Sequence, residues 1–246
     1  MMSAAAVTAE PLAESSTRLV LLQRFEVSNA GGSIVLPHSA ERVIAFLALQ
    51  RAPVRRQFLA CSLWLDVDDD HASASLRSAL WRARRLDVPI VESRNGTIAL
   101  SAEMRTDVAE IAALSARLLS TREAPTSEEL ELIASAGELL PGWYDDWVLI
   151  EREHLRFQRL QALECACESL IACRRFVDAA EAAFAAVACE PLRESAHRAL
   201  VKLHVAEGNI AEALRQYHLF ESLLRSTLGC QPSALMRDLL PDVRLR

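Results

Sequence analysis

Long hydrophobic runs are missing from this sequence of 246 residues. No apolar stretch approaches the roughly 18 residues that a helix needs to span a bilayer. The first 17 residues contain alanine, serine and glutamate but neither a basic start nor a long apolar core, so they lack the features of a secretory signal peptide. We therefore expect a disordered leader over residues 1–17, no membrane association and a cytoplasmic protein.

Cysteine pairs with metal-binding spacing are also missing. The six cysteines form no C-x-x-C pair, and no histidine lies at zinc-finger spacing from them. The acidic segment Asp66–Asp70 has the carboxylate density of a calcium loop but lacks that loop's glycine and closing glutamate. We expect no metal, no cofactor and reduced, mostly buried thiols. The cysteines are Cys61, Cys165, Cys167, Cys173, Cys189 and Cys230.

Catalytic motifs are a third absence. The six histidines are scattered singly along the chain, and no G-x-S-x-G, P-loop or H-E-x-x-H motif surrounds any of them. His197 and His204 are one heptad apart on a predicted helix, a spacing that packing or surface residues show more often than catalytic ones do. The sequence therefore argues against an enzyme.

The charges are distributed unevenly between the two halves of the chain. Glycine, proline and aromatic residues are few while leucine and alanine dominate, which indicates a helix-rich protein. The net charge is −6, but residues 18–100 contain 11 arginines against 8 acidic residues, a net charge of +3. Residues 101–246 carry a net charge of −7. This asymmetry indicates one half that faces nucleic acid and another that meets a different partner.

A basic amphipathic helix is predicted over His71–Leu86. Leu76, Leu80 and Ala83 fall on one side of it at i, i+4 and i+7 spacing. An arginine-rich opposite face suits the major groove of DNA, where arginine pairs with guanine edges or clamps phosphates. The alternative is a solvated basic helix on an ordinary helical domain. The opposite face carries Arg77, Ser78, Trp81, Arg82, Arg84 and Arg85.

A β-hairpin is predicted directly after this helix. The β-prone runs of Ile90–Leu100 flank Asn95-Gly96, the strongest short hairpin signal because a type I′ turn needs positive φ at both positions. Arg94 lies at the tip. Most such hairpins only turn the chain, but a basic helix followed by a basic hairpin is the layout of a winged helix. The hairpin would then be the wing, which reaches the DNA backbone or minor groove.

The residues before the basic helix complete this predicted domain. Residues 18–36 alternate loosely between apolar and polar positions, which predicts a hairpin or meander. A first helix is expected after Pro37 with Ser39 as its N-cap, and a second is expected from Pro53. Asp70 is the expected cap of the basic helix. Residues 18–100 are thus predicted to form a winged helix with an N-terminal β-sheet.

The remaining chain is predicted to be entirely helical. Amphipathic segments cover Val108–Ser120, Glu128–Leu140 and Asp146–Cys173, with Thr126 or Ser127 as the cap of the second. The last third contains a repeat, because the seven residues from Arg175 align with those from Asn209 at an offset of 34 residues, the tetratricopeptide period.

Three residues of the second repeat fit the tetratricopeptide pattern. Gly208, Ala213 and Tyr217 occupy the small, small and aromatic positions at which paired helices pack. We expect Gly208 to let two helices approach closely. The alternative is a simple bundle of α-hairpins. Either architecture stacks antiparallel helices into an interaction surface and provides no catalytic pocket.

Seven segments carry a further motif pattern: Leu63-Trp64, Ala74–Leu86, Asp107-Val108, Glu190–Leu200, Glu207–Asn209, Ala213–Tyr217 and Leu228-Gly229. With these segments the chain resembles the actinobacterial antibiotic regulatory protein (SARP) type of transcriptional regulator over roughly residues 18–240. The resemblance implies a mainly α protein with an OmpR-like winged helix-turn-helix domain at 18–105, followed by an all-α, TPR-like bacterial transcriptional activation domain at 106–246.

The resemblance implies a sequence-specific regulator that binds double-stranded DNA at promoter direct repeats and activates transcription by contacting RNA polymerase. It also implies a homodimer that can form on DNA, and a cytoplasmic, nucleoid-associated location. Arg77, Arg82, Arg84 and Arg85 match the family's recognition helix and Arg94 its wing. The alternative function is a helical-repeat adaptor whose winged helix binds protein. Salt-dependent duplex binding separates the two, because phosphate contacts release counterions.

Overall fold

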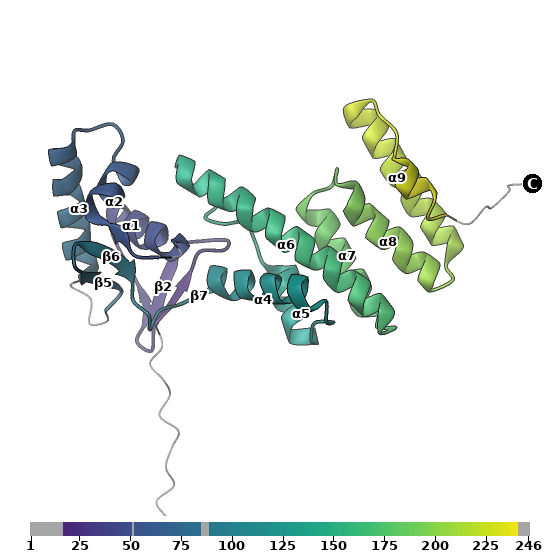
Figure 1. Ribbon diagram of the computed structural model, residues 1–246, viewed down its shortest axis with the longest axis horizontal. Helices are drawn as coiled ribbons and strands as arrows, with labels where there is room; N and C mark the ends of the chain where they lie inside the picture. Colours follow the sequence, from purple (N-terminus) through teal and green to yellow (C-terminus); the bar gives the residue numbers. More distant parts are fainter. Residues whose placement is uncertain (1–16, 51, 85–88, 241–246) are drawn as a thin grey trace, which may run out of the picture. The chain divides into compact units, whose positions relative to one another are not determined.

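The protein forms two compact units. The computed structural model describes residues 17–50, 52–84 and 89–240 (Figure 1). Unit 1 comprises the chain up to Val20 together with Phe25–Thr106, and unit 2 comprises Leu21–Arg24 together with the chain from Asp107 onward. The predicted leader, apart from Thr17, lies outside the described residues.

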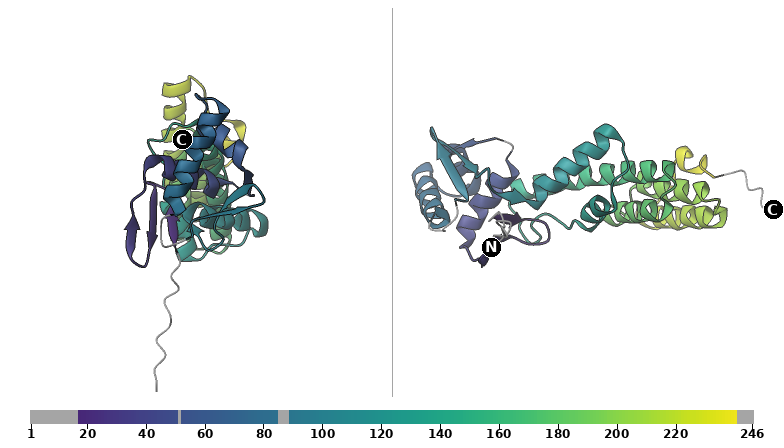
Figure 2. Two further views of the ribbon diagram at one scale, coloured as in Figure 1. Left: turned by 90° about the vertical axis from the view of Figure 1, so that its left-hand side faces the viewer. Right: turned by 90° about the horizontal axis from the view of Figure 1, so that it is seen from below.

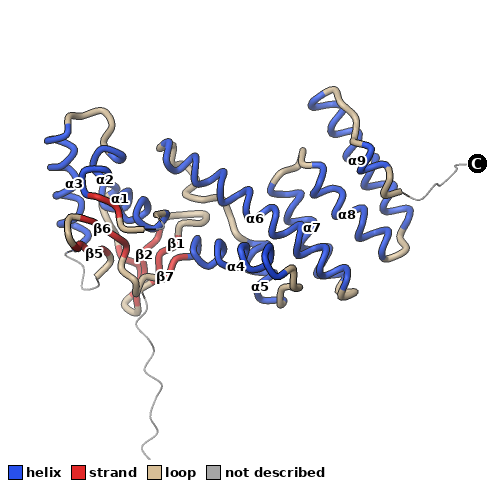
Figure 3. Tube along the Cα trace, viewed as in Figure 1, coloured by secondary structure: helices blue, strands red, loops and turns tan. Residues whose placement is uncertain are grey.

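Unit 1 begins with a four-stranded sheet. Its strands are β1 (Arg18–Val20), β2 (Glu26–Asn29), β3 (Gly32–Ile34) and β7 (Arg105–Thr106), in the order β3-β2-β1-β7. The first three are antiparallel neighbours and form the predicted meander, while β7 pairs with β1 in parallel. The described strands all belong to unit 1 (Figure 3).

Three helices follow the first sheet strands and form the core of unit 1. They are α1 (His38–Leu49), α2 (Arg56–Leu63) and α3 (Asp69–Arg84), and α3 packs against both α1 and α2. A second sheet of three strands, in the order β4-β6-β5, accompanies them. Its strands are β4 (Val54–Arg55), β5 (Val91–Arg94) and β6 (Thr97–Leu100).

Both predicted starts of the first two helices were wrong. Pro37 is the N-cap residue of α1 with φ −68°, and the helix has no side-chain cap, so the Ser39 hydroxyl does not fill that role. The second helix does not start at Pro53, because Val54 and Arg55 pair with Ile98 and Thr97 of β6 instead. This tertiary pairing outweighs the local helix pattern.

Unit 2 is a stack of helices. Neighbouring helices α6 to α9 pack against one another in chain order, and α7, α8 and α9 lie alongside one another in two views (Figures 1 and 2). The helices are α4 (Asp107–Thr121), α5 (Ser127–Ser135), α6 (Asp146–Ala172), α7 (Phe176–Cys189), α8 (Glu194–Ala206), α9 (Ile210–Leu228) and α10 (Ala234–Arg237). None of the described helices is both long and apolar enough to cross a bilayer.

Helix α5 ends at Ser135, five residues earlier than predicted. The residues beyond it pair with the segment Leu21–Arg24: the Leu140 N–H donates to the Leu21 carbonyl at 2.8 Å, and Leu139 forms an antiparallel bridge with Leu22. A backbone committed to this pairing cannot continue the helix. The predicted bounds of α4 and α6 agree with the structure to within one residue.

The 34-residue repeat is visible in the backbone. Arg175 and Asn209 are the N-cap residues of α7 and α9, with φ/ψ of −86°/66° and −84°/62°. Their N–H groups donate to the carbonyls of Leu170 and His204, at 2.9 and 2.8 Å, which are themselves 34 residues apart. Two chain segments with the same turn geometry at the same offset form a TPR-like repeat.

Gly208 plays a different role from the one predicted. No atom lies within 4 Å of the position that its Cβ would occupy, so it does not allow a close helix approach. Its φ is +79°, and Arg174, the equivalent residue of the preceding repeat, has φ 59°. The left-handed backbone at the end of α8 therefore favours glycine here. Ala213 and Tyr217, in contrast, are buried in the core as expected.

The cysteines are all free, but fewer are buried than predicted. Cys165 and Cys167 are buried, whereas Cys173 and Cys230 are exposed. Burial raises the pKa of the Cys167 thiol to about 12, so it stays protonated and behaves as a small apolar group. Among the described residues, no group of three or more histidine, cysteine or acidic side chains is arranged to hold a metal ion.

Candidate nucleic-acid interface

The apolar stripe of α3 fastens this helix to unit 1. Leu76, Leu80 and Ala83 are at most 3% exposed, as their spacing predicted, and Ala72 and Ala79 extend the same face. Small and branched apolar side chains along one face leave the polar face outward. The packing of α3 against α1 and α2 therefore fixes which of its side chains a ligand can reach.

The N-terminus of α3 is capped by Asp68, and the predicted cap Asp70 lies inside the first turn. The His71 N–H donates to Asp68 Oδ1 at 2.9 Å, and the His71 ring Nδ1 lies 2.8 Å from the same oxygen. The bond from the His71 backbone, followed by that from its ring, lowers the pKa of the Asp68 carboxyl. The helix starts at Asp69, two residues before the predicted start at His71.

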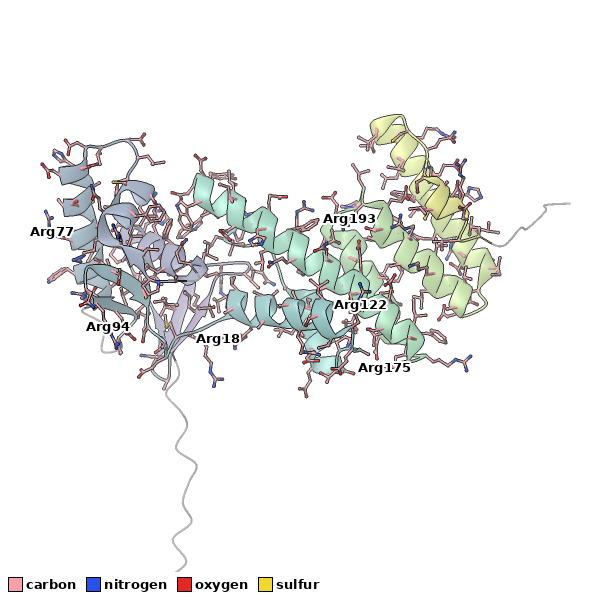
Figure 4. All side chains as sticks on the ribbon, in the orientation of Figure 1. Arg18, Arg77, Arg94, Arg122, Arg175 and Arg193 are labelled. Atoms are coloured by element: carbon pink, nitrogen blue, oxygen red, sulfur yellow. The ribbon has the colours of Figure 1, made fainter. Side chains whose placement is uncertain are left out.

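The opposite face of α3 carries the predicted DNA-binding side chains. Arg77, Ser78, Arg82 and Arg84 are exposed, and Trp81 is 58% exposed. The sixth predicted residue of this helix, Arg85, lies outside the described residues. Figure 4 shows Arg77 projecting from α3.

The arginines of α3 differ in what they contact. The Arg84 Nη2 donates to Ser93 Oγ of β5 at 2.6 Å, which ties the end of α3 to the hairpin. The Arg82 Nη1 lies 3.4 Å from Ser39 Oγ, a long hydrogen bond. Arg77 has no hydrogen bond or ion pair among the described residues. Among the described arginines of this face, Arg77 is thus the one with all its donors available to a ligand.

The predicted wing is formed by β5 and β6. Asn95 and Gly96 have φ of 50° and 77°, the two positive values that a type I′ turn requires. Arg94 pairs in register with Thr97 across the turn, and its side chain is 84% exposed. The Arg94 Nη2 lies 3.5 Å from the Glu92 carboxylate, an exposed and weak ion pair that a phosphate can replace.

Two further basic residues of this surface, Arg55 and Arg56, were not among the predicted DNA-binding residues. Arg55 and Arg56 are exposed at the junction of β4 and α2, and the Arg56 N–H donates to the Gly96 carbonyl at 3.2 Å. Arg56 also lines a hollow of about 490 Å³ with Arg77. The sequence signal for these residues was the Arg55-Arg56 doublet. Because the second helix was predicted to start at Pro53, the doublet was assigned to that helix and not to the DNA-binding surface.

Acidic residues share that hollow. Asp69 and Asp70 line it together with Arg56 and Arg77, so its formal charge is zero. A polyanion is therefore expected to favour the C-terminal part of α3 and the wing over the hollow itself. The cations of that part are Arg82, Arg84 and Arg94.

An exposed basic helix, packed on two others and followed by a basic wing, can place arginines against both base edges and phosphates. With a TPR-like helical unit after it, this architecture is that of a winged-helix transcriptional regulator. The bacterial transcriptional activator domain family matches residues 105–244 of the chain. The chain belongs to that family and is a regulator of the SARP type, as its sequence motifs predicted.

A solved structure shares the fold of nearly the whole chain. The chain is similar to Mycobacterium tuberculosis EmbR, whose structure was determined in complex with a low-affinity phosphopeptide, with a TM-score of 0.73 at 20% identity. The similarity covers 92% of this chain and 64% of the EmbR chain. At this identity it shows the fold alone. No curated protein sequence matches the chain.

Proposed function

We propose that the protein is a sequence-specific DNA-binding activator of transcription, with residues 18–105 as the DNA-binding domain and residues 106–246 as the activation domain. The exposed basic face of α3 is the observation that supports this most, because Arg77, Arg82 and Arg84 are all exposed on it and can each donate to DNA. In this proposal α3 enters the major groove and Arg94 reaches the backbone from the wing. The DNA-binding set is Arg77, Ser78, Trp81, Arg82, Arg84, Arg85 and Arg94.

The helical unit has a different task in this proposal. Its net charge of −7 over residues 101–246 disfavours a phosphate surface. Stacked repeats present ridges and grooves that suit protein partners. We propose RNA polymerase and a second copy of this chain as those partners, with the homodimer forming on promoter direct repeats. This places the protein at the nucleoid in the cytoplasm.

Gel-shift titrations on promoter DNA test the proposal. Arg77→Ala should weaken operator binding by about 1–3 kcal/mol if it reads a base. If Arg77 contacts a phosphate instead, the slope of log K against log salt should become shallower by about 0.9. Arg215→Ala on α9 is the matched control, because that arginine is exposed and lies in the acidic unit. Parental binding by an Arg77→Ala, Arg84→Ala double variant would contradict the assignment.

Arg84 needs a control of its own, because it also holds the wing. Ser93→Ala removes the acceptor of the Arg84 hydrogen bond but leaves the arginine charge in place. Arg84→Ala should weaken DNA binding more than Ser93→Ala if the guanidinium contacts DNA. Equal losses would mean that Arg84 only positions the wing. Duplex binding that does not respond to salt would favour the adaptor alternative.

A further inference from the structure

Unit 2 contains a cavity that the proposed function does not use. Its volume is about 470 Å³, and it lies among α6, α7, the start of α4 and the connection that follows α5. Much of its wall is aliphatic, with Leu22, Ile111, Leu155 and Ala185 contributed by four separate segments. Small-molecule sites in proteins have volumes of roughly 300–1,000 Å³ and similar apolar walls.

Three arginines of α6 line the same cavity on one helix face, and two of them are neutralised. Arg152 pairs with Glu138 at 2.9 Å. Arg156 pairs with Glu153 at 2.8 Å and with Glu190, which is not among the lining residues, at 2.6 Å. Glu138 and Glu153 also line the cavity. Their pairs with Arg152 and Arg156 therefore contribute no net charge to it.

Arg159 is the third arginine, and its charge is not neutralised. Its Nε and Nη2 donate to the carbonyls of Ile133 and Ala134, both at 2.8 Å. Among the described residues, no carboxylate lies within ion-pair distance of it and its Nη1 has no hydrogen-bond partner. Desolvation by the surrounding protein lowers the pKa of Arg159, so the guanidinium is electrostatically unsatisfied. The last-turn carbonyls of α5 supply only partial negative charge.

We propose that this cavity binds a small organic carboxylate, with the carboxylate paired to Arg159 and its apolar body against Ile111, Leu155 and Ala185. Among the described arginines of the lining, Arg159 alone has no carboxylate partner, and a single unpaired guanidinium matches a monoanion better than a doubly charged phosphate. The N–H groups of Arg159 Nη1 and the second N–H of Nη2 remain as parallel donors for a carboxylate. The inference goes beyond the proposed function, because it gives the helical unit a ligand in addition to protein partners.

Isothermal titration of the full chain with octanoate, benzoate and octanamide tests this. Octanamide has the shape of octanoate without its charge, so it should bind about tenfold more weakly or worse. The comparison of octanoate with benzoate shows whether the apolar body is aliphatic or aromatic. If neither acid binds, or if octanoate and octanamide bind equally well, the proposal is overturned.

Two variants separate the charge from the cavity. Arg159→Gln can still donate to a carbonyl but should abolish the preference for octanoate over octanamide, while Arg215→Gln on α9 should retain it. Ala185→Leu adds volume to the wall and should weaken both ligands without touching the guanidinium. If Arg159→Gln still prefers octanoate to octanamide, or if Ala185→Leu binds octanoate with the parental affinity, the proposal is overturned. If Arg159→Gln does not fold, the affinities of Ala185→Leu and the comparison of octanoate with octanamide still test the proposal.

The outcome is independent of the DNA-binding proposal. Gel shifts of Ala185→Leu should match the parent in the absence of acid, because Ala185 lies in unit 2 and carries no charge. Failure of the titrations would therefore remove the ligand site and leave the proposed regulator intact. Failure of the Arg77→Ala test would remove the proposed DNA-binding role of Arg77 and leave the ligand site intact.

Discussion

Asp107 joins two segments of unit 2 that are more than 80 residues apart in the sequence. Asp107 is 7% exposed, and its carboxylate accepts the N–H groups of Leu21 and Leu22 at 2.9–3.0 Å, as well as that of Val108 at 2.8 Å. Because a buried carboxylate is stable only when its oxygens are hydrogen-bonded, these N–H donors and the side chain satisfy one another. Asp107 thus helps to hold Leu21–Arg24 within unit 2, together with the backbone pairing of this segment with Glu138–Leu140.

Asp107→Ala should therefore destabilise the protein strongly for a single polar residue. The loss leaves the N–H groups of Leu21 and Leu22 without their acceptor, and we expect a decrease of about 2–4 kcal/mol in the free energy of unfolding. Urea denaturation followed by circular dichroism measures it. Glu123→Ala, at an exposed position, is the control and should change little. A decrease as small as that of the control would contradict the anchoring role.

At the scale of the element, the clearest local signal is the capping box of α5. The Thr126 side chain accepts the Glu129 N–H at 3.2 Å, and the Glu129 carboxylate accepts the Thr126 N–H at 2.9 Å. Arg117 adds an ion pair to Glu129 at 2.6 Å. Such a box provides hydrogen-bond acceptors for two N–H groups that have no partner within the helix. The start of α5 can therefore be predicted from its own residues.

Thr126→Ala should lower the free energy of unfolding by about 1 kcal/mol. The effect of Glu129→Gln should depend on pH. The Thr126 N–H and Arg117 hold the pKa of Glu129 below its usual value, so its stabilisation is complete above about pH 4.3 and is lost as the pH falls through the folded pKa. Denaturation of parent and variant at pH 7 and pH 3 measures this. A difference between them that persists unchanged at pH 3 would rule out the carboxylate as its source.

The wing turn allows a second test at this scale. Gly96 has φ 77° and open space around the Cβ position, so Gly96→Val suffers backbone strain without a clash. We expect a cost of about 1–2 kcal/mol and weaker DNA binding. Asn95→Asp should be tolerated, because aspartate also adopts positive φ. Thermal denaturation and gel shifts compare the two variants, and identical behaviour would be inconsistent with the turn setting the wing.

At the scale of the molecule, the charge is divided between the two units. Unit 1 contains the described basic face of α3 and the wing, whereas residues 101–246 carry the excess of acid. This arrangement explains how a protein with a net charge of −6 can still be proposed to bind DNA. Local field, more than net charge, decides where a polyanion is attracted.

A fragment of residues 17–108 should bind operator DNA more weakly than the whole chain and fail to activate transcription. It retains α3, the wing and the Asp107 acceptor of Leu21 and Leu22. It lacks the unit proposed to dimerise, so the gain from two linked half-site contacts is lost. Gel shifts and reconstituted transcription measure both properties. Activation by the fragment equal to that of the whole chain would make the helical unit dispensable.

Several features of the protein were determined by the sequence alone because their causes are local. The spacing of Leu76, Leu80 and Ala83 places them on one helix face whatever surrounds it, and the Asn95-Gly96 turn depends on its own backbone angles. The resemblance and the 34-residue repeat needed no tertiary information either. These signals located the basic face of α3 and its exposed arginines.

Tertiary structure decided the features whose partners lie far along the chain. Arg55 was assigned to a helix because its strand exists only by pairing with Thr97, and α5 was predicted too long because Leu139 pairs with Leu22. Local propensity differs by only fractions of a kcal/mol between such alternatives, so distant hydrogen bonds outweigh it. For the same reason, only the folded chain places Arg159 beside a cavity with apolar walls and without a carboxylate partner among the described residues.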